Sequence, residues 1–328
     1  MKMLIAGIII SLIFVYFTFK GVNFEDTLKG LGNANYTFLA LALIIAIIPT
    51  LLRAMRLQII VSPIKKTSLR KLFPITCIGF MAIVLFPLRT GELVRPYLLH
   101  QESKISLTSS LAIIFLERVF DSLILLCMLV IVILNSDVSS MITRSGYGLL
   151  VTLLILISII VFIYFRTDMV LRLLMPLTDR CSKKWQLKIE KIVKNVADGF
   201  HIISRPKILF YTLFLSLLLW ALTGLTIYAL FYFLQLNLPL ICAFTVLIIT
   251  IVGVSVPAAP GFLGTFQFAC IMALSLFNVP KENAVLFSMV YYLLGIGITI
   301  LLGVIFLPFI DFSFKEGLKK LRIQSKAV

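Results

Sequence analysis

The segment Leu72–Lys104, LFPITCIGFMAIVLFPLRTGELVRPYLLHQESK, decides how this chain is folded. Its first half is apolar enough to enter a membrane, whereas its second half carries Arg89, Glu92 and Arg95. Basic segments on both sides of it belong on the same face of the membrane, so it must cross an even number of times. We therefore predict a re-entrant helical hairpin that starts and ends on the cytoplasmic side.

The composition of the whole chain is that of a membrane protein. Of 328 residues, 61% are hydrophobic and 13% are charged, with a mean hydropathy of +1.11. Soluble domains are about half apolar and a quarter charged, so an ordinary soluble enzyme is excluded. The apolar runs have the length of membrane helices rather than of short alternating strands. They are Met3–Phe19, Tyr36–Leu52, Leu72–Leu88, Ile105–Leu134, Tyr147–Phe165, Leu209–Leu234, Leu240–Val256, Phe262–Phe277 and Ala284–Leu307.

The distribution of positive charge predicts the orientation. The net charge is +16, and most Lys and Arg lie in three segments, Arg53–Lys71, Arg166–Lys207 and the tail from Asp311. Such a pattern marks cytoplasmic loops, and no nucleic-acid-binding motif accompanies it. We expect a multi-pass protein of the cytoplasmic membrane with both termini in the cytoplasm and Asn135–Gly146 outside.

A second interrupted run is predicted to form a hairpin of the opposite orientation. Leu240–Phe277 is broken by the stretch Pro257-Ala258-Ala259-Pro260-Gly261. The predicted architecture is an all-α membrane domain, residues 1–328, with about six full crossings and two re-entrant hairpins. It divides into two half-repeats, residues 1–134 and 147–310, of inverted orientation.

The basic loop 166–208 is predicted to contain an amphipathic helix. Trp185, Ile189, Val193, Val196 and Phe200 recur at helical spacing, with lysines on other faces. We expect this helix to rest on anionic lipid headgroups at the cytoplasmic face. The basic tail 311–328 is expected on the same side.

Six charged residues fall in the two apolar regions of the first half. They are Arg89, Glu92, Arg95, Glu117, Arg118 and Asp121. At bilayer depth each costs ~2.5–3.5 kcal/mol, so they need partners or water. Either they neutralise one another and hold the hairpin to its neighbour, or the arginines line a cavity that binds an anionic group. The three basic and three acidic residues are neutral together.

The second hairpin carries no charge. Its candidate residues are Pro257, Pro260, Gly261, Gly264 and Gln267. A helix that begins near Phe262 would direct backbone N–H groups at an anion. Alternatively, the glycines allow close helix–helix contact.

Four stretches together resemble the lysylphosphatidylglycerol synthase transmembrane-region family, also called flippase-like. They are LLRAMR from Leu51 to Arg56, FPLRTGELVRPYLL from Phe86 to Leu99, ERVFD from Glu117 to Asp121 and VPAAPGFLGTFQ from Val256 to Gln267. The resemblance adds Arg53, Arg56 and Tyr292 as secondary candidate residues. Members commonly have Glu at the position of Gln267 and often Arg near Tyr292, so a second charged site is not carried over.

The resemblance implies lipid translocation, of an aminoacyl-phospholipid or a polyprenyl-phosphate-linked sugar. The alternatives are a membrane enzyme that acts on a lipid-linked substrate and a non-transporting partner of a separate lipid synthase. The five cysteines have no CxxC spacing and there are two histidines, so we expect no metal, no cofactor and no catalytic residues. The expected partners are membrane lipids, and a second copy of the chain or a separate lipid synthase is left open.

Overall fold

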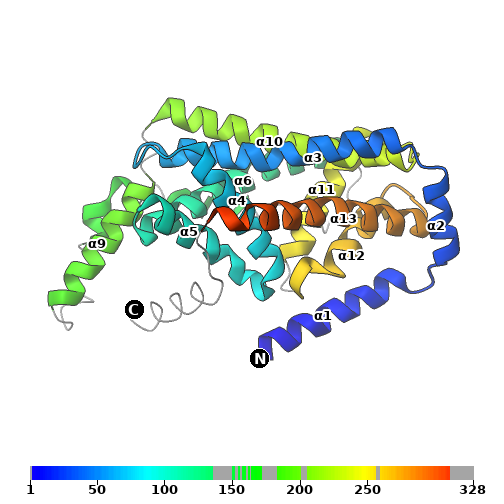
Figure 1. Ribbon diagram of the computed structural model, residues 1–328, viewed down its shortest axis with the longest axis horizontal. Coiled ribbons are helices and arrows are strands. Elements are labelled where there is room, and N and C mark those ends of the chain that lie inside the picture. The colour runs from blue at the N-terminus through cyan, green and yellow to red at the C-terminus, as the bar shows by residue number, and fades with distance from the viewer. Residues whose placement is uncertain are drawn as a thin grey trace.

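The chain forms an elongated bundle of helices in the computed structural model (Figure 1). The structure describes residues 2–135, 183–200, 205–255 and 259–310. Between these it describes residues 150, 151, 154, 155, 157–159, 162 and 164–171. All regular elements of the described residues are helical, as the sequence predicts. The predicted Tyr147–Phe165 run, the loop before it and the tail 311–328 lie wholly or partly outside this description.

Most helices follow the predicted apolar runs, but α3 continues beyond the predicted end at Leu52 to Val61. They are α1 Lys2–Phe19, α2 Phe24–Gly32, α3 Tyr36–Val61, α4 Leu69–Leu85, η1 Pro87–Leu93, α5 Val94–Ser103, α6 Leu107–Asn135, α9 Lys183–Gly199, α10 Pro206–Phe233, α11 Leu240–Ser255, η3 Pro260–Phe262, α12 Thr265–Ser275, α13 Lys281–Phe306 and η4 Leu307–Phe309. Among the described residues, three helices are long and apolar enough to cross a membrane: Tyr36–Val61, Pro206–Phe233 and Lys281–Phe309. The chain is therefore an integral membrane protein with several shorter apolar helices packed between these spans.

The two ends of the bundle differ in charge. At one end, which we call the basic end, lie the loop with Lys65 and Lys66, the start of α6 and the helix α9, whose Asn195 carbonyl accepts a hydrogen bond from Ser109 Oγ at 2.7 Å. At the far end, the Asn35 N–H donates to the Phe233 carbonyl at 2.8 Å, which joins the start of α3 to the end of α10. Figure 1 shows α9 and α2 at these opposite ends.

The first predicted hairpin is formed by α4, η1 and α5. Its helices have 17 and 10 residues, so α5 is only ~15 Å long and is too short to cross a bilayer. The turn lies directly on the backbone of α4, because a Cβ placed on Gly91 would be 2.0 Å from the Ala82 carbonyl oxygen. Glycine is therefore required where η1 folds back over α4. The start of α4 and the end of α5 both lie at the basic end, beside the end of α13.

The second hairpin is formed by α11, η3 and α12, and it starts and ends at the far end of the bundle. Its helices have 16 and 11 residues. Gly264 has a φ of +84°, and a Cβ there would be 2.6 Å from the Ser11 carbonyl oxygen of α1. The tips of the two hairpins, η1 and η3, are in contact inside the bundle. The chain thus brings together two helix breaks that lie far apart in its sequence.

The hydrophobic core is divided between the two halves of the chain. One buried cluster is built mainly from α3, α4, α5 and α6, and the other mainly from α10, α11, α12 and α13. Trp220 and Phe244 pack against both clusters. Each half therefore has a core of its own, and the two cores meet at α10 and α11.

The amphipathic helix predicted in the basic loop is present as α9. Val193 and Phe200 are buried, whereas Lys191 and Lys194 are exposed. Lys194 donates a hydrogen bond to Glu190 at 2.6 Å, and this contact raises the pKa of Lys194. The apolar face of α9 packs against the start of α6, so this face is at least partly occupied by protein.

Candidate functional site

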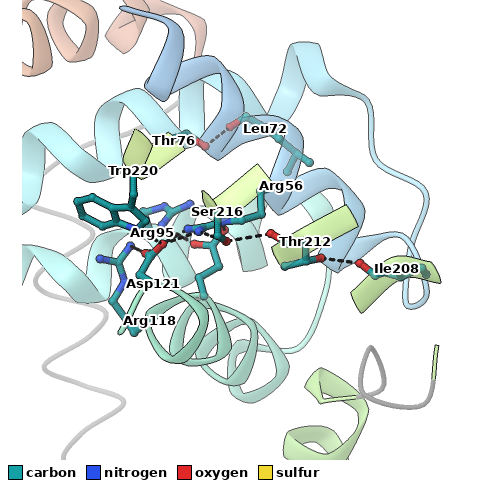
Figure 2. Close-up of polar contacts among 11 residues, drawn as sticks. Arg56, Leu72, Thr76, Arg95, Arg118, Asp121, Ile208, Thr212, Ser216 and Trp220 are labelled. Atoms are coloured by element: carbon teal, nitrogen blue, oxygen red, sulfur yellow. Dashed lines mark hydrogen bonds and ion pairs between the residues drawn. The ribbon is translucent and has the colours of Figure 1, made fainter. Parts of the chain in front are cut away.

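Two ion pairs are buried in the first half of the bundle, and they join three helices (Figure 2). Arg56 of α3 donates to Asp121 of α6, with Nη1 2.5 Å from Oδ1 and Nη2 3.2 Å from Oδ2. Arg95 of α5 donates from Nη1 to Glu117 Oε2 at 2.7 Å. Glu117 also lies 3.8 Å from Arg56 Nε, which links the two pairs. These four side chains are between 0% and 8% exposed.

Two polar side chains of α10 complete the contacts of the pairs. Ser216 Oγ accepts from Arg56 Nη1 at 2.7 Å and donates to the Thr212 carbonyl at 2.9 Å. Trp220 Nε1 donates to Asp121 Oδ1 at 3.1 Å. The pairs therefore connect the second half of the chain to the first. Nothing in the sequence pattern of α10 distinguishes these two residues, so sequence reasoning missed both.

The ring of Phe80 is surrounded by three guanidinium groups. The Cζ atoms of Arg53, Arg95 and Arg118 lie 4.5, 4.8 and 5.7 Å from its centroid. Such cation–π contacts are each worth ~0.5–2 kcal/mol. Gly79 makes room for one of them, because a Cβ there would overlap the side chain of Arg95. The Phe80 ring thus stabilises three positively charged guanidinium groups close to one another. The sequence alone does not indicate this role.

Arg53 and Arg56 lie inside a helix rather than in a loop, which corrects the predicted boundary at Leu52. Because α3 continues to Val61, its last three turns belong to the bundle. The predicted apolar run stops at Leu52, but buried residues of the helix continue beyond it. Arg56 is 1% exposed and is paired with the Asp121 carboxylate. The predicted basic segment is correspondingly shorter and retains Lys65, Lys66, Arg70 and Lys71.

Arg53 differs from the other arginines in its partners. Within the part of the chain that the structure describes, the Arg53 side chain forms no hydrogen bond and no ion pair. Its guanidinium makes a cation–π contact with the ring of Phe80. Its side chain lines a cavity of about 240 Å³ between α3, α10, α11 and α13. A volume of this size could hold about eight water molecules at ~30 Å³ each. We call it the Arg53 cavity.

The wall of the Arg53 cavity combines hydroxyl groups with apolar side chains. The hydroxyl-bearing residues are Thr50, Thr223, Thr226, Thr250, Tyr291 and Thr299. Phe262 and Phe266 of the second hairpin form part of the wall, and Trp220 connects it to the ion pairs. Thr223, Thr226 and Thr299 donate their hydroxyl hydrogens to carbonyls of their own helices. The Arg53 guanidinium and the hydroxyls of Thr50 and Tyr291 are therefore the part of this wall suited to an anionic oxygen group.

The cluster has an excess of positive charge. Four arginines, Arg53, Arg56, Arg95 and Arg118, surround the two carboxylates of Glu117 and Asp121. This corrects the neutral count made from sequence, which left Arg53 and Arg56 among the loop residues. In addition, Arg95 Nε and Nη2 have no hydrogen-bond acceptor among the described residues. The arrangement is therefore better suited to an anion than to a cation.

The remaining charged candidates are Arg118 of α6 and two residues of η1, Arg89 and Glu92. Arg118 is 39% exposed and lies 3.4 Å from Asp121, which is three residues further along α6. The backbone of Arg89 is in η1, but its side chain is outside the description. Glu92 lies in the same turn and is partly buried. The expectation that Arg89 lines a headgroup cavity stays a prediction.

In the second hairpin the candidates stabilise the turn itself. Gln267 Oε1 accepts from the Gly264 N–H at 2.8 Å, and Tyr292 Oη donates to the Gly261 carbonyl at 2.9 Å. The helix α12 begins at Thr265, not near Phe262, and this cap satisfies the Gly264 N–H. Gln267 is therefore directed at its own helix terminus. Pro260 is exposed, and Pro257 lies outside the description.

The blocks that form this site are shared with a known family. The sequence model of a family described as "Lysylphosphatidylglycerol synthase TM region" matches residues 4–303 of the chain. The chain belongs to the lysylphosphatidylglycerol synthase TM-region family. All four stretches on which the resemblance was based fall within these residues.

Two relatives of the family are similar to this chain over most of their length. A UPF0104 membrane protein of Methanocaldococcus jannaschii is 26% identical over 225 residues, 67% of this chain and 90% of the relative. A UPF0104 membrane protein of Methanothermobacter thermautotrophicus is 24% identical over 310 residues, 90% of each chain. No solved structure is significantly similar to the chain.

Proposed function

We propose that the protein moves a lipid with an anionic, phosphate-bearing headgroup across the membrane, and that the headgroup passes through the Arg53 cavity. The observation that carries this proposal is the guanidinium of Arg53, which lines a cavity inside the bundle and, among the described residues, is attracted by Asp121 but forms no hydrogen bond or ion pair with a carboxylate. Ionisable residues at membrane depth are rare and typically mark the path of a substrate. A planar guanidinium also matches the geometry of phosphate oxygens.

The two hairpins support a transport mechanism. They start from opposite ends of the bundle, their tips are in contact, and Phe262 at the second tip lines the Arg53 cavity. Interrupted helices at matching positions in two inverted halves are typical of transport sites near the membrane midplane. We propose that the halves form such an inverted repeat, and that small movements of the tips expose the cavity to one side and then to the other.

The hydroxyl-lined wall explains how a polar headgroup could be carried at acceptable cost. Acyl chains can stay in the bilayer while the headgroup exchanges water for the Arg53 guanidinium and for the hydroxyls of Thr50 and Tyr291. The dehydration cost of the phosphate is then offset by charge-assisted hydrogen bonds. Gln267 and Tyr292 of the second half are uncharged. The positive charge that binds the phosphate would therefore come from the arginines of the first half alone.

We further propose that the chain resides in the cytoplasmic membrane, with the basic end and both termini in the cytoplasm, and that it acts as a transporter rather than an enzyme. The concentration of Lys and Arg at the basic end supports this orientation. Candidate substrates are an aminoacyl-phospholipid and a polyprenyl-phosphate-linked sugar, both of which carry phosphate.

Reconstitution into liposomes tests the proposal. Phospholipids with a fluorescent headgroup in the inner leaflet become accessible to an impermeant reductant only when they are moved outwards. We expect Arg53→Gln to reduce this rate by roughly ten-fold or more, since it removes a charge-assisted contact. Arg53→Lys should be intermediate, because lysine keeps the charge but loses the fork.

The matched control is Arg205→Gln, which removes an exposed arginine before α10. It should transport at the rate of the unchanged protein. Chromatography of the lipid after the assay should recover it unaltered, as a transporter requires and an enzyme does not. An unaltered transport rate in well-folded Arg53→Gln would contradict the proposal.

A further inference from the structure

A second cavity lies at the basic end of the bundle, apart from the Arg53 cavity. It has a volume of about 610 Å³, within the range of sites for small organic ligands. Its apolar wall is a row of aromatic rings. The ring centroids of Phe73 and Phe306 lie 4.9 Å apart, and those of Phe306 and Phe309 lie 5.6 Å apart. Phe309 is 71% exposed. We call this cavity the basic-end groove.

The polar rim of the groove is the first turn of α4. Arg70 and Lys71 are the second and third residues of this helix, both are exposed, and both line the groove. The N-cap residue Ser68 forms no side-chain cap, and no acidic residue lies in the first turn. The positive end of the helix dipole therefore coincides with two cations, an arrangement that disfavours the helix start unless an anion is nearby.

We propose that the basic-end groove binds an anionic phospholipid, with its phosphate at the first turn of α4 and one acyl chain along the three phenylalanines. The side chains of Arg70 and Lys71, beside a helix terminus with no side-chain cap, supply donors for phosphate at the rim of the groove. Glu102 of α5 is the acidic residue of the lining, so the rim keeps a net positive charge. This site goes beyond the proposed transport function and does not depend on it.

The general preference for positive charge on cytoplasmic loops does not account for this arrangement. That preference concerns the side of the membrane and is equally met by Lys65 and Lys66, which are exposed in the preceding loop. It does not require cations in the first turn of a helix, beside an aromatic wall. The position of Arg70 and Lys71, rather than their charge alone, identifies the ligand.

Photo-labelling with a phosphatidic acid that carries a diazirine in one acyl chain tests the site. The full-length protein is placed in lipid nanodiscs, and labelled peptides are located by mass spectrometry. We expect peptides with Phe73 and Phe306 to be labelled more strongly than the outward face of α10, where Phe210 and Tyr211 are 65% and 56% exposed. A diacylglycerol with the same chains should show no such preference, because it has no phosphate.

Two charge-matched variants separate a specific site from general surface attraction. Arg70→Gln/Lys71→Gln should reduce groove labelling by about ten-fold, whereas Lys65→Gln/Lys66→Gln should leave it near the unchanged level. Equal loss in both variants would overturn the proposal, as would equal labelling of the groove and of α10. Displacement of the label by millimolar inorganic phosphate alone would also overturn it, because the site would then recognise the free ion.

Discussion

Arg95 and Glu117 form an ion pair in which Nη1 lies 2.7 Å from Oε2 and the two side chains are 1% and 0% exposed. This pair fixes the short helix α5 of the first hairpin to α6. Glu117 is also 3.8 Å from Arg56, so one carboxylate serves two arginines on different helices. A single carboxylate of α6 thus connects the hairpin helix α5 with α3.

We predict that Glu117→Gln destabilises the protein by about 3–5 kcal/mol, because it leaves Arg95 buried without a carboxylate. Adding Arg95→Met to Glu117→Gln should recover part of this loss, since the unpaired charge is then removed. Thermal unfolding in detergent measures both. The exposed pair Lys194–Glu190 on α9 is the control, and Lys194→Gln should leave the unfolding temperature unchanged. A Glu117→Gln protein as stable as the unchanged chain would show that the pair is not needed for folding.

Gly91 provides a second test of the first hairpin. Gly91→Ala would place a Cβ 2.0 Å from the Ala82 carbonyl oxygen, so η1 must move away from α4. Overpacking of this kind costs about 1–3 kcal/mol. Gly297→Ala in α13 is the matched control, because no atom lies within 4 Å of its added Cβ. That variant should be neutral or slightly stabilising in the same unfolding experiment. Equal stability of the two variants would mean that η1 does not rest on α4.

Contact between the hairpin tips can be measured by cross-linking. Cysteines at Thr90 in η1 and at Ala259 beside η3 should be joined by a short bifunctional thiol reagent, because η1 and η3 are in contact. The native cysteines are first replaced. A protein with Thr90→Cys and Asn283→Cys, the latter at the far end of the bundle, should not be cross-linked. If both pairs react equally, or neither reacts, the tips do not share one site.

Orientation can be tested with single exposed residues at the two ends. Ser68 precedes α4 at the basic end, and Asn283 lies in the first turn of α13 at the far end. In intact cells, an impermeant thiol reagent should label Asn283→Cys and should not label Ser68→Cys. Both should react after the membrane is permeabilised. The reverse pattern would contradict the predicted cytoplasmic location of the basic end.

Much of the fold could be predicted because membrane helices need long apolar runs. The runs Met3–Phe19 and Leu240–Val256 agree with α1 and α11 to within one residue. The first hairpin also followed from sequence, because the cytoplasmic preference of basic segments left Leu72–Lys104 an even number of crossings. In the site, Arg118 and Asp121 lie three residues apart on one helix, a spacing at which side chains can meet.

The parts of the site that could not be predicted depend on contacts between distant helices. The apolar run of α3 ends in composition at Leu52, and only the position of Asp121 shows that Arg56 belongs inside. Ser216 and Phe80 are ordinary membrane-helix residues until Arg56 and Arg95 are placed beside them. Periodicity identifies a buried face but does not identify the helix that covers it.

The pairing of Arg56 with Asp121 also constrains how the protein is made. The two residues are 65 positions apart, so α3, α4 and α5 are all synthesised before the carboxylate that neutralises Arg56. Until then the Arg56 guanidinium, near the end of α3, lacks the carboxylate that neutralises it in the folded bundle. Release of α3 from the insertion machinery ahead of α6 is therefore unfavourable. Residues 36–135 should leave the translocon as one assembled group of helices rather than one helix at a time.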